Sequence, residues 1–583
     1  FSSLSWLSTF WATPFGIGWT PKIRNADRLN QSYRKTNEHR RETTKNRFFL
    51  EMITMMNLKL SNRPLTLLLS VCLAAGLAAG CSGEDKAKQA KTAAAPMTFV
   101  FGDTTFNPDN EEPNVNPHFK YAGWAAMRYG VGETLFRYSN KMQIEPWLAT
   151  SYELLDPLTW KLTLREGIAF SNGRPMTGAA VKACLEHLVK VHDRAQGDLM
   201  IDSILAEGQT VTIKTKRPNP TLLNYLSDPY GIIFDMEAGI TDDGIVVGTG
   251  PYKVTKLVSG ETIELVRNEK YWNGTPGFDQ VKVLTISDGD TLTMALQSGE
   301  IDGAYGMPYA SYPIFQKGGY TFTSTPTSRT FFAHMNFKSP IVQDPAVRKA
   351  IAMGVDKERF VRDLLNGNGY VAKGAFPSTF AFGGDSVKAK PYNPDLARAT
   401  LDAAGWVDSD GDGIRDKNGQ PLRIRWLTYP SRQEQPLLAE SAQANLKAIG
   451  IDVVINNTAD HNSIRVRPEL WDIYVSAMVT APTGDPAYFF TTHALDRSAV
   501  NNGHYHSDKL EALARELNDT FDVKKRGELA VQMQQTVLDD DAFIFFSHLK
   551  MSMITKDTVV GLTAHPTDFY EITAKLAPAP AKQ

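Results

Sequence analysis

The sequence predicts an α/β protein with more than one domain, and three observations support this prediction. In 446–455 an apolar helix end is followed by a glycine stop at Gly450 and an apolar strand, an αβ unit typical of a parallel sheet. Residues 158–165 alternate as a strand, and a helix begins after Thr177, a residue type that caps helices. About 500 residues follow residue 80, enough for two or three domains.

The other expected elements follow in chain order. Residues 98–102 form a short apolar run that ends in turn chemistry and predict the first strand. Residues 107–117 are rich in Asn, Pro and Glu and predict a loop, whereas 124–135 carry apolar residues at helical spacing. The turn 167–177 then leads into the helix capped by Thr177.

A secretory leader is predicted at 56–80. It has a basic start, an apolar run of about a dozen residues, and small residues before Cys81, and the run is shorter than the roughly 20 residues that span a membrane. The end of this segment resembles a bacterial lipobox, which implies a lipid on the Cys81 thiol. Residues 81–95, rich in Lys, Ala and Gln, are then expected to be a tether.

Residues 1–55 require a separate interpretation. The chain starts at Phe1, and the segment has scattered Arg, Asn and Thr without a helical or strand period. We interpret it as a non-native extension from translated upstream sequence, with initiation at Met56, Met55 or Met52. A genuine cytosolic or targeting extension is the alternative.

Composition narrows the class of protein. The 42% hydrophobic and 22% charged residues are ordinary globular values, and the net charge of -2 argues against a nucleic-acid partner. Of the three cysteines, Cys72 lies in the leader and Cys81 is the expected lipid site. Cys184 is then alone in the mature chain, which excludes an internal disulfide, and its apolar helical surroundings predict a buried structural thiol.

A series of motifs resembles one protein family. The run 146–181 resembles the signature of the bacterial extracellular solute-binding proteins of family 5, the receptors for peptides and nickel. Further segments resemble family motifs in the same order along about 400 positions. These are 248–254, with Gly-Thr-Gly-Pro-Tyr; 266–272, with Arg-Asn and Tyr-Trp; 296–302; 344–351; and 392–397 with 403–406.

The resemblance implies an α/β, two-lobed periplasmic-binding-protein fold (class II, cluster C type) with an extra subdomain in lobe one. Lobe I is expected to combine 96–140, 246–345 and 560–583, with an inserted subdomain at 141–245 and lobe II at 346–559. It also implies a monomeric receptor that closes on its ligand by hinge motion. Its partners would be the permease and ATPase subunits of an ABC importer, with the membrane reached through the lipid anchor.

The resemblance places the ligand beside the loop 116–124. Tyr121 and Trp124 are the first expected cleft walls. Arg128 shares a helix face with Trp124 and could hold a ligand carboxylate with two hydrogen bonds, although a solvated or interdomain arginine is equally compatible with the sequence.

A second expected ligand segment is 481–490. Peptide receptors of the family use an aspartate here for the peptide amino terminus, but this chain has Pro482, which weakens the oligopeptide interpretation because a buried ammonium needs a carboxylate. Asp485 is a candidate ligand residue, with a helix cap as the favoured alternative. Arg194 resembles an arginine that holds chelate carboxylates in nickel-type receptors. The second such arginine is missing near 228–231, where Tyr230 remains a candidate wall residue.

Histidines provide the remaining metal signal. His493, His504 and His506 lie close together in sequence, and imidazole suits nickel or copper. Surface or hydrogen-bonded histidines are the favoured alternative. Nickel, as a chelate, is therefore the first expected ligand, and a short peptide or related amino compound is the second.

One acidic segment has the spacing of a calcium loop. Its carboxylates are Asp408, Asp410, Asp412 and Asp416, but Gly419 stands where the final glutamate is needed. A polar turn is favoured over a calcium site, and 417–421 predicts a hairpin turn.

An enzyme is the rival class, for example a lipoprotein hydrolase. The sequence contains no H-E-x-x-H, no G-x-S-x-G, no Walker A lysine motif and no paired C-x-x-C. The sequence therefore predicts a binding protein and not an enzyme.

Overall fold

The computed structural model describes residues 95–106, 114–432, 434–498 and 500–580. The predicted leader, Cys81 and the extension 1–55 lie outside these residues. Within the described ranges, no helix combines the length and apolar character that crossing a membrane requires.

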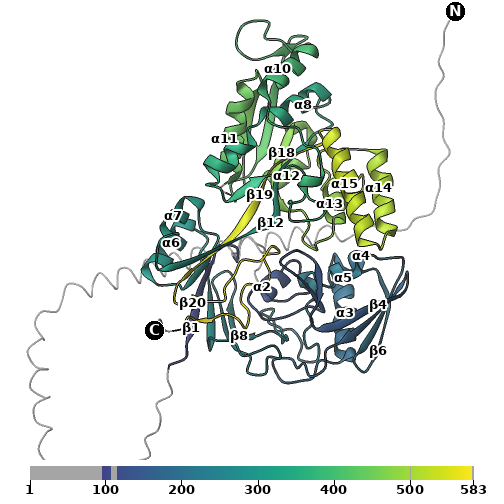
Figure 1. Cartoon of the computed structure of the whole chain (residues 1–583), viewed down its shortest axis with the longest axis vertical. Helices are drawn as coiled ribbons and strands as arrows, with labels where there is room; N and C mark the ends of the chain where they lie inside the picture. The colour runs from purple at the N-terminus through teal and green to yellow at the C-terminus, as the bar shows by residue number, and fades with distance from the viewer. Residues whose placement is uncertain (1–94, 107–113, 433, 499, 581–583) are drawn as a thin grey trace, which may run out of the picture. The chain divides into compact units, whose positions relative to one another are not determined.

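Two long antiparallel strands connect the two halves of the described chain (Figure 1). They are β12 (Tyr320–Met335) and β19 (Phe543–Lys556), and they lie in the middle of an 11-stranded sheet. The strand order is β17-β16-β18-β12-β19-β11-β1-β10-β9-β8, with β13 (Gly369–Val371) beside β19. The α/β class is confirmed.

Lobe I lies on one side of this pair. Its strands are β1 (Thr98–Asp103), β8 (Tyr252–Val258), β9 (Thr262–Arg267), β10 (Gln280–Thr285) and β11 (Gly303–Tyr305), accompanied by α6 (Gly289–Ser298) and α7 (Tyr312–Phe315). The predicted first strand is confirmed as β1, which pairs in parallel with β10 and β11. Its inward side chains Phe99 and Phe101 are fully buried in the lobe I core.

The chain between β3 (Ile144–Pro146) and β8 contains a separate four-stranded antiparallel sheet. It has the order β4-β5-β7-β6, built from β4 (Ala149–Asp156), β5 (Thr159–Leu164), β6 (Ile201–Glu207) and β7 (Thr210–Thr215). Helix α3 (Gly178–Val191) packs on β6 and β7, and Thr177 Oγ1 accepts a hydrogen bond from Ala180 N, which confirms the predicted cap. Cys184 on α3 is buried, as predicted. This sheet shares one apolar core with lobe I.

The helix expected at 124–135 is shorter than predicted. It is α2 (Gly123–Arg128), and the chain turns at Gly130, which has φ +70°. A Cβ at Gly130 would lie 2.5 Å from the Ile572 carbonyl oxygen, so glycine is required for this approach. The C-terminal segment thus ends the helix, a long-range contact that the helical spacing does not reveal.

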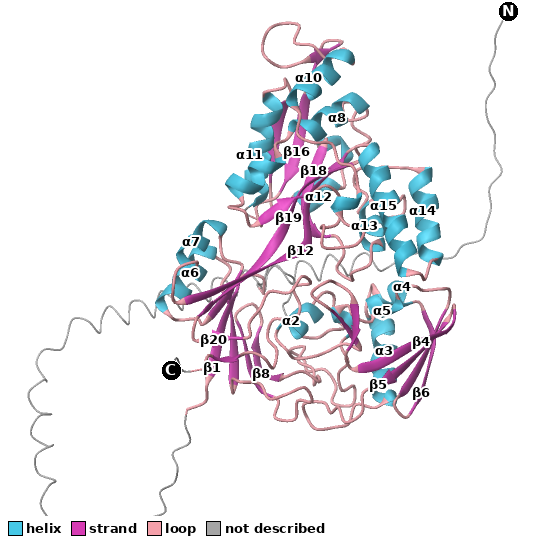
Figure 2. Ribbon diagram, viewed as in Figure 1, coloured by secondary structure: helices cyan, strands magenta, loops and turns pink. Residues whose placement is uncertain are grey.

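Lobe II confirms the predicted αβ unit. Strands β16 (Arg423–Thr428) and β17 (Asp452–Asn457) are parallel, and α11 (Glu434–Lys447) lies between them in the chain. The sheet is completed by β18 (Ile473–Val479) and flanked by helices (Figure 2). These helices include α8 (Pro345–Gly354), α10 (Pro394–Ala403), α13 (Ala487–His493), α14 (Asp508–Asp519) and α15 (Val523–Asp539). The predicted hairpin is confirmed by the pairing of β14 (Asp416–Lys417) with β15 (Gln420–Pro421).

Side chains of β12 and β19 pack in the cores of the two lobes. Phe331 and Met335 of β12 already pack in the lobe II core, whereas Met551 and Met553 of β19 belong to the lobe I core. The β12–β19 register shifts between Pro326 and Thr330. Because both strands run from one core into the other without a loop, the sequence contains no break at this point.

Buried histidines give the fold a predicted pH dependence. Burial is the main cause that lowers the pKa values of His118, His493 and His548 to about 3 and of His565 to about 4. An unfolded histidine has a pKa near 6.5, so the unfolded chain binds more protons. As far as these histidines determine it, we expect the free energy of unfolding to have its highest value above pH 6.5. Below that pH it should decrease by up to about 1.4 kcal/mol per pH unit for each such histidine until the folded pKa is reached.

Urea titrations between pH 7.5 and 5 would measure this slope. His493 provides a specific test, because neither ring nitrogen has a hydrogen-bond partner and the ring packs against Phe332 and Phe489. His493→Phe should reduce the dependence of the free energy of unfolding on pH by the contribution of one histidine. His506→Asn, at an exposed position paired with Asp496, should not reduce it. Parallel curves for wild type and His493→Phe would contradict the prediction.

Candidate ligand-binding cleft

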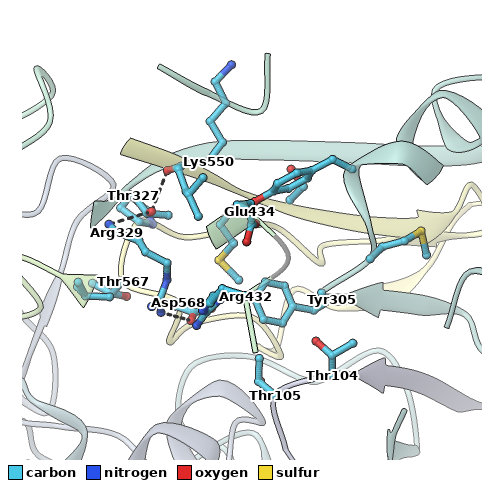
Figure 3. Close-up of a pocket in the computed structure, with 18 of the residues that line it drawn as sticks. Thr104, Thr105, Tyr305, Thr327, Arg329, Arg432, Glu434, Lys550, Thr567 and Asp568 are labelled. Carbon is cyan, nitrogen blue, oxygen red and sulfur yellow. Dashed lines mark hydrogen bonds and ion pairs between the residues drawn. The ribbon is translucent and has the colours of Figure 1, made fainter. Parts of the chain in front are cut away.

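Two cavities lie between lobe I and lobe II. Their volumes are about 680 Å³ and about 150 Å³. Residues of both lobes line each cavity, and the two cavities share Thr105, Arg329, Arg432, Val479, Thr567 and Asp568. The smaller one is shown in Figure 3. Shared lining residues make these two spaces neighbouring compartments of one interlobe cleft.

Two arginines of the hinge and lobe II dominate the shared wall. Arg329 lies on β12, and Arg432 lies just before α11. Arg329 has one carboxylate nearby, Asp568, with 4.0 Å between Nη2 and Oδ2. In the described part of the chain, Arg432 forms no ion pair within 4.0 Å. Burial, and next the charge of Arg432, lower the pKa of Arg329. Two neighbouring half-buried guanidiniums, with Asp568 near Arg329 and Glu434 near Arg432 as counter-charges, can hold an anionic ligand group.

Arg128 lines the larger cavity, but its guanidinium already forms ion pairs within the protein. Its guanidinium lies 2.9 Å from Asp103 Oδ2, 2.5 Å from Asp568 Oδ1 and 3.3 Å from Glu571 Oε1. The rings of Trp124 and Tyr305 lie 4.5 Å and 4.8 Å from it. Arg128 therefore fixes the C-terminal segment to α2 and β1, so it has little donor capacity left for a ligand carboxylate.

The larger cavity contains the first two expected wall residues. Tyr121 and Trp124 both line it, together with Lys120, Asp193 and Pro482. The Tyr121 side chain is 68% exposed, so it lies at the mouth, and the partly buried Trp124 lies closer to the core. Both residues that were predicted as cleft walls therefore line this cavity, and their contact with a ligand stays a prediction.

Arg194 and Tyr230 do not line either of the two cavities. Arg194 is paired with Asp198 and Asp228 at 3.2 Å and 3.3 Å, and the buried Tyr230 donates its hydroxyl to Asp198. The neighbour Asp193 reaches the cavity instead. The two carboxylates hold Arg194 beside the cleft. They also neutralise the positive charge that was expected to face a chelate.

Asp485 is engaged inside lobe II. Its carboxylate accepts hydrogen bonds from Arg526 Nε at 2.9 Å and Nη2 at 2.7 Å, and from Ala487 N at the start of α13. The favoured alternative of a helix cap fits this placement. A ligand contact does not, because the buried Arg526 takes both carboxylate oxygens.

The three candidate metal histidines are not brought together. His493 is buried among aromatic rings, and His506 pairs with Asp496 on the surface. Over the described ranges, the only group of three residues that could share an ion is Asp408, Asp410 and Asp412, which are exposed. Asp416 accepts hydrogen bonds from Ser409 instead. This arrangement is what a polar turn requires and is no evidence for calcium.

Direct contacts between the lobes accompany the cleft. Asn224 Nδ2 donates to Thr483 O at 2.7 Å, and the Tyr309 hydroxyl of lobe I hydrogen-bonds Glu434 of lobe II. The hairpin of β2 (Phe136–Tyr138) and β3 (Ile144–Pro146) packs on the 481–484 loop. The lobes are therefore in direct contact beside the cavity.

The sequence analysis did not identify Arg329, Arg432 or Asp568. Arg329 stands in a strand whose neighbours give no functional signal. Arg432 had a usable signal, because it follows the carboxyl end of the parallel strand β16, where open α/β sheets bind ligands. Asp568 lies in a C-terminal loop that the prediction assigned only to lobe I.

Comparisons with known proteins agree with this architecture. Residues 143–500 match the family model described as bacterial extracellular solute-binding proteins, family 5, middle. The chain is 28% identical over 415 residues to the nickel-binding protein NikA of Staphylococcus aureus, covering 69% of this chain and 80% of that protein. It is 25% identical over 460 residues to the oligopeptide-binding protein AppA of Bacillus subtilis, covering 75% and 84%.

A solved structure gives the same result. The crystal structure of NikA from Brucella suis in complex with Fe(III)-EDTA matches with a TM-score of 0.73 and 27% identity, covering 83% of this chain and all of that one. The two-lobed fold expected from the motifs is thereby confirmed, and the family match spans more than half of the chain. The chain therefore belongs to the bacterial extracellular solute-binding proteins of family 5.

Proposed function

We propose that this protein is the extracytoplasmic receptor of an ABC importer and captures nickel as a small chelate by cleft closure. The observation that carries the proposal is the pair Arg329 and Arg432, which face the interlobe cavities with Asp568 as the near counter-charge. Guanidinium groups bind carboxylates with paired, charge-assisted hydrogen bonds, and the cavity volume suits a small molecule.

A chelate is favoured over a bare ion for a structural reason. The lining residues include arginines, lysines, carboxylates, methionines, aromatic rings and hydroxyl groups, and no histidine or cysteine is among the described residues that line the two cavities. A nickel ion would therefore arrive with its own ligands, and the carboxylates of the chelator would meet the arginines. The similarity to a nickel-binding protein and to a receptor holding a metal–EDTA complex supports this class of ligand.

A short peptide is the alternative ligand. Its terminal carboxylate could bind the same arginines, and the similarity to an oligopeptide-binding protein supports this class. Pro482, which lines the larger cavity, provides no carboxylate for a peptide ammonium. The nickel chelate is therefore the first proposal.

The cellular location of the receptor is also part of the proposal. The leader 56–80 and a lipid on Cys81 would hold the protein on the outer side of the membrane, beside its permease and ATPase partners. The tether 81–95 would let a monomeric receptor reach the permease. The role is delivery of the ligand and involves no catalysis.

Calorimetric titration of the purified receptor tests the ligand. We expect heat of binding with nickel plus histidine, and none with short peptides. Arg432→Gln should weaken chelate binding by about 100-fold, because a charged hydrogen bond contributes roughly 1.5–3 kcal/mol. The control Arg359→Gln, at a surface arginine that is 66% exposed, should bind as wild type. Micromolar binding of peptides without binding of nickel–histidine would overturn the metal proposal.

A further inference from the structure

We propose that Asp568 is the residue that sets the net charge of the ligand the cleft accepts, an inference that rests on the proposed function of Arg329 and Arg432. Asp568 lines both cavities, and it lies beside Arg329 and Arg432 in the close-up of Figure 3. Its Oδ2 is 4.0 Å from Arg329 Nη2. A fixed carboxylate at this position partly neutralises the positive charge of the arginines that a ligand would otherwise contact.

The position of this carboxylate is determined by several contacts. Asp568 has φ +72°, a conformation that non-glycine residues rarely adopt, and its backbone N–H donates to His565 O at 3.0 Å. Arg128 binds it twice, with Nε donating to the backbone oxygen at 3.2 Å and Nη2 lying 2.5 Å from Oδ1. Unusual backbone conformations that surrounding contacts enforce are typical of functional sites. These contacts therefore fix the position of the Asp568 carboxylate in the cleft.

The charges around the cleft show what this anion does. Arg128 has three carboxyl groups around it, Asp568, Glu571 and Asp103. Burial raises the pKa of Glu571 well above its usual range, so the carboxylates of Asp568 and Asp103 balance this guanidinium and leave negative charge over for Arg329. Glu434 is held by Tyr309 across the cleft. With Asp568 beside Arg329, Arg432 remains as the one cleft guanidinium without a carboxylate within 4.0 Å over the described ranges.

This arrangement favours ligands whose total charge is close to zero. Nickel with two histidine anions is neutral, because the metal contributes two positive charges and each histidine one negative charge. Nickel–EDTA carries a net charge of minus two. In a poorly solvated cleft, each uncompensated ligand charge near Asp568 costs affinity. The wild-type cleft should therefore prefer the neutral chelate.

The test is the ratio of two dissociation constants, for nickel–EDTA and for nickel with two histidines, measured by calorimetry on the whole protein. Asp568→Asn should lower this ratio by about tenfold or more, because it removes a negative charge. Asparagine also tolerates the left-handed backbone at this position. Arg329→Gln should raise the ratio. The control Asp508→Asn, at a fully exposed carboxylate that lines neither cavity, should leave the ratio unchanged because water screens this charge.

The outcomes separate this inference from the proposed function. An unchanged ratio in Asp568→Asn, with a wild-type melting temperature, overturns the role of Asp568 even where Arg432→Gln still weakens chelate binding by about 100-fold. If peptides bind and chelates do not, the metal proposal fails. The same comparison is then made with Ala-Ala-Ala and Ala-Glu-Ala, whose charges differ by one. If wild type binds neither pair of ligands, both proposals are overturned.

Discussion

Substitution of Gly484 by alanine is expected to prevent the lobes from closing and to weaken ligand binding by at least tenfold. Gly484 has φ +67°, and a Cβ here would lie 2.5 Å from the Met142 carbonyl oxygen of the hairpin that faces it. The obstacle is backbone, so no rotamer change can relieve it. The lobes must move apart, and the closed state loses the contacts that closure provides.

A matched control separates this clash from backbone strain. Gly411 has φ +80°, and a Cβ there meets nothing within 4 Å. Gly411→Ala therefore carries the same left-handed strain, about 1–2 kcal/mol, without an interlobe contact. Calorimetry with nickel–histidine should show wild-type affinity for Gly411→Ala and weak binding for Gly484→Ala. Small-angle scattering should show that ligand compacts only the former. Wild-type affinity in Gly484→Ala would contradict a closed state of this geometry.

Substitution of Glu133 by alanine is expected to lower the free energy of unfolding by about 3–5 kcal/mol, the range for breaking a buried charged network. The buried Glu133 carboxylate accepts four hydrogen bonds from segments that are far apart in the chain. The donors are Trp147 Nε1 at 2.9 Å, Thr249 Oγ1 at 2.8 Å, Tyr271 OH at 2.7 Å and Trp272 Nε1 at 2.9 Å. Alanine would leave all four donors without their acceptor.

Denaturant titration of Glu133→Ala and of a surface control would measure this effect. Glu264 is suitable because its carboxylate pairs with Lys256 at 3.4 Å while both side chains are at least 40% exposed. Glu264→Ala should change the free energy of unfolding by less than about 1 kcal/mol. A loss for Glu133→Ala as small as that of the control would show that the four donors find other partners.

The elements that could be predicted are those whose signals are local. The Thr177 cap and the glycine stop at Gly450 each act within a few residues, and the structure has both helix ends near these positions. Tyr121 and Trp124, which line the larger cavity, were predicted through a motif and not through a contact pattern. The Glu133 network also explains physically why several of the recognised motifs occur together, since Thr249, Tyr271 and Trp272 all belong to such motifs.

The elements that could not be predicted depend on distant segments. Arg329, Arg432 and Asp568 come from three segments more than 100 residues apart, and only the folded chain brings them to one wall. The same holds for Asp485, whose partner Arg526 lies 41 residues further along. A charged residue shows its type in the sequence, but its counter-ion decides whether it is free for a ligand.

The shared core of lobe I has a consequence for the order in which the chain can fold. Phe99 and Phe101 near the start pack in one cluster with Met551, Ile572 and Leu576 near the end. While a ribosome is still making the chain, the first lobe lacks the residues that complete it, and contacts of such long sequence separation form slowly. A nascent chain of this design keeps lobe I incomplete until residues 551–576 are made, and with the proposed leader 56–80 that state would suit passage through a translocation channel for unfolded polypeptides.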